Sequence, residues 1–165
     1  MPRRDTLPVP MFSGRLGFLS NFDTTPFWMP ELDAMVRSGE HAFNALKTTD
    51  GGRSWVSISG DLPSRGSTHA IIEDVVDPSL LFIGTEFGAY ATRDGGAHWF
   101  RLAGLPTIAV RDLAIQKREH DLVIATFGRG IYILDDFRPL RTTTPATLAA
   151  AATLFPVKDA MLYVP

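Results

Sequence analysis

The feature that most constrains this chain is an Asp-Gly-Gly repeat. Two segments, Thr48–Trp55 and Thr92–Trp99, share a threonine, an aspartate two residues later, a pair of glycines and a closing tryptophan. Their aspartates, Asp50 and Asp94, lie 44 residues apart. Short strands that recur every roughly 40 to 45 residues are typical of β-propeller blades, which are four-stranded antiparallel sheets.

The residues between these markers predict strands. Runs of β-branched and aromatic residues, bounded by glycine and Asp-Pro pairs, indicate four strands in one repeat and three in the next. A weaker third copy aligns Phe87–Asp94 with Arg129–Asp136 at an offset of 42 residues. We therefore expect a mainly β chain with about two antiparallel, blade-like sheets, an incomplete propeller. The expected strands are Ala70–Val76, Leu80–Thr85, Ala89–Thr92, Trp99–Leu102, Val110–Ile115, Leu122–Thr126 and Ile131–Leu134.

The repeated segments also have the chemistry of tight turns. Glycine accepts positive φ, and an aspartate side chain can accept hydrogen bonds from turn amides. The spacing resembles the Asp-box of bacterial neuraminidase repeats, with His98 standing where that box usually has serine or threonine. The longer string Leu80–Asp136 is similar to the last blades of sortilin-type propeller proteins, and the resemblance covers about residues 47–165. It implies a structural role for Asp50, Gly52, Trp55, Asp94, Gly96 and Trp99.

Bacterial proteins of this sortilin-like type are often labelled glycosyl hydrolases, so a propeller-type glycoside hydrolase is one alternative function. A sialidase-like site needs arginines, a Tyr/Glu pair and an acid drawn from several blades. The chain has residues of these types, but no spacing selects them as a site. They are Glu86, Tyr90, Arg111 and Arg129.

Residues 1–46 do not carry the repeat. They contain the string Phe18–Phe22 (FLSNF) and the string Glu40–Phe43 (EHAF), and Ser38–Lys47 predicts a short helix with Ser38 as its N-cap. These strings resemble the opening of the NADAR family, which includes N-glycosidases acting on riboflavin-pathway intermediates. The resemblance implies Glu40 as a catalytic carboxylate for C–N bond cleavage, a second alternative function.

Three segments are expected: a NADAR-like segment 1–46, propeller repeats 47–137, and a tail 138–165. No linker rich in glycine, serine or proline separates the first two, which suggests a composite or truncated chain. In the tail, Thr144 as N-cap and Pro145 at the first helical position predict a short helix up to about Leu154.

Composition narrows the function further. The net charge is −2, there is no cysteine, and no apolar run reaches the length of a membrane-spanning helix. We expect no metal, cofactor, nucleic acid or membrane partner, and a cytoplasmic location by default because no secretory signal is recognisable. The four histidines lack metal-site spacing; they are His41, His69, His98 and His120.

The leading hypothesis is a non-catalytic interaction or scaffold module. Loops on a rigid set of strands are binding surfaces by default, so a protein or peptide partner is expected at the blade loops. Unpaired sheet edges also favour self-association.

Overall fold

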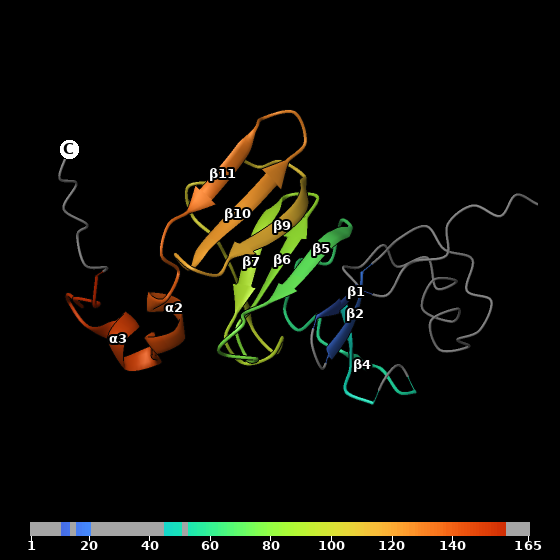
Figure 1. Cartoon of the computed structure of the whole chain (residues 1–165), viewed down its shortest axis with the longest axis horizontal. Coiled ribbons are helices and arrows are strands. Elements are labelled where there is room, and N and C mark those ends of the chain that lie inside the picture. The colour runs from blue at the N-terminus through green and yellow to red at the C-terminus, as the bar shows by residue number, and fades with distance from the viewer. Residues whose placement is uncertain (1–10, 14–15, 21–44, 51–52, 158–165) are drawn as a thin grey trace, which may run out of the picture.

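The computed structural model describes residues 11–13, 16–20, 45–50 and 53–157, and in residues 11–13 and 16–20 it describes the backbone alone. The described residues form three antiparallel sheets that follow one another along the chain (Figure 1). The first sheet contains β1 (Met11–Ser13), β2 (Leu16–Ser20), β3 (Ala45–Thr48) and β4 (Val56–Ser57). The second contains β5 (Thr68–Glu73), β6 (Leu81–Thr85), β7 (Gly88–Thr92) and β8 (Trp99–Arg101). The third contains β9 (Val110–Gln116), β10 (Asp121–Thr126) and β11 (Ile131–Leu134).

Within each sheet, every strand pairs with the strand that precedes it in the chain. The second sheet shows the register of such a four-stranded meander, with Ile83 opposite both Ile71 and Tyr90. In the third sheet Ile124 has the same place, opposite Leu113 and Tyr132. The third sheet is therefore a copy of the first three strands of the second.

Individual contacts repeat at the same period. The amide of Ile58 donates to the carbonyl of Ala45 at 2.8 Å, and 44 residues later the amide of Leu102 donates to the carbonyl of Ala89 at 2.9 Å. These bonds join the segment after the fourth strand to the start of the third strand in the first and second sheets. The sequence repeat is thus also a structural repeat.

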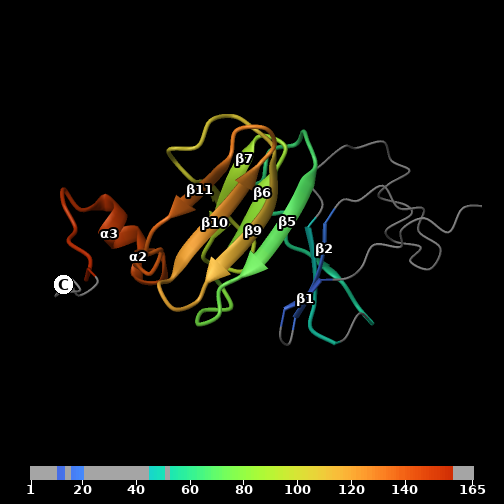
Figure 2. The same ribbon diagram turned by 45° about the horizontal axis from the view of Figure 1, so that its top comes forward.

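The three sheets stack through two apolar cores, as blades do. In Figure 2 the strands β9–β11 lie in front of β6 and β7, with β5 beside β9, while β2 lies beside β5 on the other side. The core between the first and second sheets contains Ala45, Ile58, Ile71, Leu81, Ile83 and Trp99. The core between the second and third sheets contains Ala70, Leu80, Phe82, Ala89, Ala91, Leu102, Val110, Leu113, Leu122, Ile124 and Phe137.

The alternating direction of side chains along each strand explains how the second sheet contributes to both cores. Neighbouring side chains in a strand point to opposite faces. Accordingly, Leu81 and Ile83 of β6 belong to the core with the first sheet, and Phe82 between them belongs to the core with the third. All three side chains are fully buried, because the second sheet is covered on both faces.

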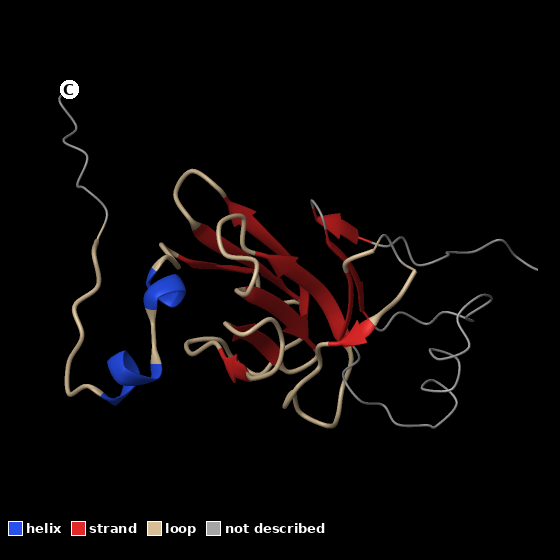
Figure 3. Ribbon diagram, turned by 90° about the horizontal axis from the view of Figure 1, so that it is seen from below, coloured by secondary structure: helices blue, strands red, loops and turns tan. Residues whose placement is uncertain are grey.

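Two short helices follow the third sheet: α2 (Pro139–Thr142) and α3 (Pro145–Ala149). They lie on one side of the strands (Figure 3). Just before α2, Phe137 packs edge-on against Phe82 with 5.1 Å between ring centroids. The guanidinium of Arg141 then binds the carboxylate of Asp74 through two bonds of 2.6 and 2.7 Å. This pair ties α2 to the second sheet across 67 residues of sequence.

The expectation of a mainly β chain with blade-like antiparallel sheets is confirmed, and the described residues form three such sheets rather than about two. The additional sheet arises because β1 and β2, from the part without the repeat, pair with β3. Ser20, within the Phe18–Phe22 string, lies opposite Ala45. Strand β3 therefore spans the expected boundary after residue 46, and the boundaries of the three expected segments stay predictions.

Both expected helices need correction. The helix Ser38–Lys47 is wrong at its end, because residues 45–47 belong to β3 and their pairing with β2 and β4 overrides the local helical pattern. Residues 38–44 lie outside the described part. The tail helix starts as expected with Thr144 as N-cap and Pro145 in the first turn, but it ends at Ala149 rather than near Leu154. Leu154 is fully exposed, so no packing extends this short alanine-rich helix.

None of the helices in the described residues is long and apolar enough to cross a membrane.

Candidate functional site

The first repeated segment folds into a turn around the Asp50 carboxylate, which we call the first aspartate turn. It joins β3 to β4. The oxygen Oδ1 of Asp50 accepts hydrogen bonds from the Thr48 hydroxyl at 2.8 Å and from the amides of Arg53 and Ser54, each at 2.9 Å. The other oxygen, Oδ2, accepts the Ser54 hydroxyl at 2.7 Å. The carboxylate thus satisfies amides that the tight turn leaves without strand partners.

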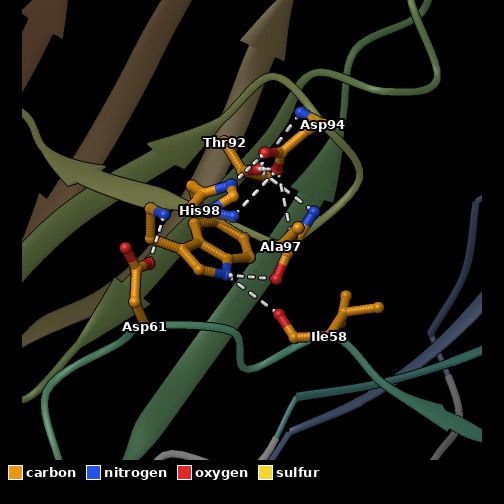
Figure 4. Close-up of polar contacts among 8 residues, drawn as sticks. Ile58, Asp61, Thr92, Asp94, Ala97 and His98 are labelled. Carbon is orange, nitrogen blue, oxygen red and sulfur yellow. Dashed lines mark hydrogen bonds and ion pairs between the residues drawn. The ribbon is translucent and has the colours of Figure 1, made fainter.

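The second aspartate turn, between β7 and β8, repeats this arrangement around Asp94 (Figure 4). Oδ1 accepts the Thr92 hydroxyl at 2.8 Å, the Ala97 amide at 3.0 Å and the His98 amide at 2.9 Å. Oδ2 lies 2.7 Å from Nδ1 of His98. The two turns therefore differ mainly in the donor to Oδ2, which is a hydroxyl in the first and an imidazole in the second.

Hydrogen bonding keeps both carboxylates ionised. The Ser54 hydroxyl and amide, with Thr48, hold the pKa of Asp50 well below its usual range. For Asp94, slight burial opposes ionisation, but bonds from the His98 amide and imidazole outweigh it and lower the pKa. The same contact raises the pKa of His98. A carboxylate that holds its proton so weakly is a poor general acid.

Trp99, which closes the second aspartate turn, connects the second sheet to the first. Its indole Nε1 donates to the carbonyl of Ile58 at 2.9 Å, and its backbone amide donates to the Asp61 carboxylate at 2.6 Å. The ring is buried in the core between these two sheets. Trp99 is therefore both a packing residue and a hydrogen-bonded link between sheets.

Two glycines, Gly60 and Gly96, allow the second aspartate turn to approach the segment after β4 closely. Gly96 has φ +105°, and a Cβ there would lie 2.5 Å from the Ile58 Cβ. Gly60 has φ +47°, and a Cβ there would overlap the carbonyls of Gly96 and Ala97. Both positions require glycine for conformation and for space. Of the other expected residues, Trp55 is half-buried, whereas Gly52 and Glu40 lie outside the described residues.

The residues considered for a glycoside hydrolase are distributed over the fold. Tyr90 packs against the core between the first and second sheets, and Glu86 and Arg129 are exposed in turns. Arg111 lies over the ring of Phe127 at 5.3 Å. Within the described part of the chain, no hydrogen bond or ion pair joins any two of these four side chains.

His69 lies at the same end of the strands as Arg111. Its Nδ1 is 3.4 Å from an Arg111 guanidinium nitrogen. Burial and the Arg111 charge lower the pKa of His69, against a weaker opposing effect of Glu86. A neutral imidazole beside a guanidinium lacks the carboxylate pair that glycoside hydrolysis uses.

Glu73 is a partly buried carboxyl group beside Asp74. Burial raises the pKa of Glu73, Lys47 opposes this effect, and the neighbouring Asp74 adds to it. Asp74 is committed to Arg141, which lowers its pKa against the effect of burial. The adjacent carboxylate is therefore not available as a nucleophile or base for Glu73. In the described residues, no group of three or more His, Cys, Asp or Glu side chains could hold a metal ion.

An apolar groove lies between the second and third sheets, and no sequence motif indicates it directly. It encloses about 560 Å³ beside β11 and α2. The segment Phe100–Leu105, which includes the end of β8, forms one wall. The other wall and the floor are formed by Ile124, Tyr132, Ile133, Leu134, Asp136, Phe137, Pro139 and Leu140. One sequence signal could have pointed to it: no Asp-Gly-Gly-x-x-Trp string follows Ile131–Leu134.

No family model and no curated protein matches this chain. Among solved structures, it is similar to a GH74 enzyme of Niastella koreensis, a β-propeller glycoside hydrolase, with a TM-score of 0.52 and 14% identity. The match covers 74% of this chain and 18% of that chain, so this chain spans a small part of the enzyme's length. At this identity the likeness shows a propeller-like fold and nothing of the activity.

Proposed function

We propose that this chain is a non-catalytic interaction module built from propeller-type blades, and that it binds extended peptide segments of protein partners. The sequence resemblance to sortilin-type propellers is in keeping with such a scaffold. The observation that carries the proposal is the groove beside β11. Its volume of about 560 Å³ is in the usual range for binding sites, and its lining is mostly apolar.

The character of the groove favours a peptide over a sugar. Apolar side chains such as Leu102, Leu134 and Leu140 dominate the lining. A sugar would leave many hydroxyl groups without partners there, which costs free energy. A peptide can instead place apolar side chains in the groove and use its backbone groups at the edge of β11.

The carboxylates support a non-catalytic role. Asp50 and Asp94 bind the amides of their own turns, and a lowered pKa makes each a poor acid. A glycoside hydrolase needs one carboxylic acid with a raised pKa and a second free carboxylate near it. Glu73 has the first property, but its neighbour Asp74 is held by Arg141.

Selection from a phage-displayed peptide library tests the proposal. We expect the chain to enrich apolar peptides, and their binding to be lost in Ala103→Arg, which places a charge at an exposed position in the groove wall. Ala97→Arg is the matched control, because Ala97 is an exposed alanine in the second aspartate turn, outside the groove.

Two results would contradict the proposal. One is a library that yields no peptide sensitive to Ala103→Arg. The other is hydrolysis of chromogenic glycosides by the purified chain that Glu86→Gln abolishes, because that result would establish a hydrolase.

A further inference from the structure

The groove wall Phe100–Leu105 has an internal counterpart. The residues 44 positions earlier are Val56–Asp61, which begin with β4, the fourth strand of the first sheet. Leu102 corresponds to Ile58, and the two make the same backbone hydrogen bond to an alanine within the first two residues of the third strand, at 2.9 and 2.8 Å. Gly104 corresponds to Gly60, and both have positive φ, +83° and +47°. The two segments therefore present the same backbone surface to the sheet that follows.

In the first of these places, the surface is covered by the next sheet's fourth strand. Trp99 of β8 donates its indole N–H to the carbonyl of Ile58 at 2.9 Å. The second aspartate turn then lies against Gly60, so closely that a Cβ on Gly60 would meet its carbonyls. The segment Val56–Asp61 thus binds a tryptophan that lies on β8, the fourth strand of the next sheet.

In the second place, the corresponding surface is open. A Cβ built on Gly104 meets nothing within 4 Å. The third sheet has three strands in the described residues, so β11 pairs with β10 and has no neighbour in the position that β8 takes beside β7. The groove lies along this free edge of β11 and against Phe100–Leu105.

We propose that the groove binds an extended, tryptophan-bearing peptide segment of a partner as a fourth strand of the third sheet. The segment runs antiparallel to β11, and its indole packs against Leu102 and Leu105 and donates to the carbonyl of Leu102. The residues that precede the indole lie over Gly104, as Gly96 and Ala97 lie over Gly60. This assignment rests on the proposed interaction function and names its ligand class. The chemistry follows from the repeat, because Trp99 makes this interaction at Ile58.

The surroundings of the groove suit an indole. Phe137 and Leu140 supply apolar surface at the α2 side, and Leu134 does so at the β11 side. Aromatic anchors in such pockets commonly dominate binding, since they bury a large apolar area and keep one polar group for a hydrogen bond. The edge of β11 supplies backbone groups, which fix the direction of the bound strand.

A synthetic peptide tests the proposal on the full chain. The probe is a fluorescein-labelled peptide with the sequence of residues 92–103, TRDGGAHWFRLA, and its control replaces the tryptophan by alanine. Fluorescence anisotropy should give micromolar binding for the probe and binding weaker by about tenfold or more for the control. Gly104→Asn should weaken probe binding by a similar factor, because asparagine tolerates positive φ and fills the space over Gly104.

Gly128→Asn is the matched protein control. Gly128 has φ +80° and open space around it, as Gly104 has, but it lies in the turn between β10 and β11 and does not line the groove. This variant should bind the probe like the unaltered chain. Unchanged thermal unfolding of Gly104→Asn would show that its loss of binding is local.

The assignment would be overturned by equal binding of the tryptophan and alanine peptides, or by no effect of Gly104→Asn. It would also be overturned if the chain alone formed dimers that Gly104→Asn dissociates, because the occupant would then be a second copy. Library peptides without tryptophan that still depend on Ala103 would leave the interaction function standing and refute only this ligand class. Failure of every peptide would refute both.

Discussion

The imidazole of His98 lies 2.7 Å from Oδ2 of Asp94, so the second aspartate turn contains a hydrogen-bonding group whose charge changes with pH. In the first turn the equivalent donor is the hydroxyl of Ser54, also at 2.7 Å from its aspartate. A hydroxyl donates over the whole accessible pH range, whereas an imidazolium forms a charge-assisted bond only while it is protonated. The two turns have the same geometry and a different chemistry.

The pH dependence of stability is the first prediction. Because Asp94 raises the pKa of His98 above its ordinary value of 6.5, the stabilising effect is complete below 6.5 and is lost as the pH rises through the raised pKa. Melting temperatures of the unaltered chain and His98→Ser, measured between about pH 5 and pH 9, should therefore diverge toward acid. A constant difference across that range would show that the imidazole adds no charge-dependent stability.

The turn carboxylate itself should matter for stability. Asp94→Ala removes the acceptor of two turn amides, a threonine hydroxyl and the His98 ring, and should lower the free energy of unfolding by about 1–3 kcal/mol. Asp135→Ala, at an exposed position after β11, should change it by no more than about 0.5 kcal/mol. Urea denaturation measures both. Equal effects would mean that the turn bonds are not a significant source of stability.

Removing either partner of the Asp74–Arg141 ion pair should lower the free energy of unfolding. The Asp74 side chain is fully buried and that of Arg141 is 14% exposed, so Arg141→Met leaves an uncompensated buried charge and should cost about 3–5 kcal/mol. Combining it with Asp74→Leu should restore part of that loss. A double-mutant cycle by chemical denaturation measures the coupling, and additive effects would show that the two groups are not coupled.

Substitutions at the two adjacent glycines of the second aspartate turn distinguish the cost of backbone strain from the cost of steric overlap. Gly95 has φ +73° with nothing near its Cβ position, so Gly95→Ala should cost about 1 kcal/mol for backbone strain. Gly96→Ala adds overlap with Ile58 and should cost about 2–4 kcal/mol. Thermal unfolding of the two variants gives the comparison. If the two variants lost the same stability, the contact between the second aspartate turn and Ile58 would be looser than the structure indicates.

Local sequence was sufficient for the two central strands of the second sheet, whereas the expected strand Ala70–Val76 differs from β5 at both ends, since β5 begins at Thr68 and ends at Glu73. The expected strands Leu80–Thr85 and Ala89–Thr92 agree with β6 and β7 to within one residue at each end. Turn glycines, aspartates and alternating apolar residues determine such hairpins within a few positions of the chain. The same local information located the two aspartates at the centres of their turns.

Other features were decided by contacts between distant residues. Residues 45–47 have a helical pattern but form a strand, because β2 and β4 pair with them on both sides. The bond between Asp74 and Arg141 joins residues that are 67 positions apart, and no local pattern indicates it.

The candidate site divides in the same way. The sequence by itself determined the repeat, the turns and the approximate strands of the second and third sheets, because these depend on neighbouring residues and backbone conformation. Only the tertiary structure decided that Leu102 and Gly104 line an open groove, while Ile58 is covered by Trp99 and Gly60 by the second aspartate turn. Whether a surface is covered depends on which strand packs against it, and that packing is a property of the assembled sheets.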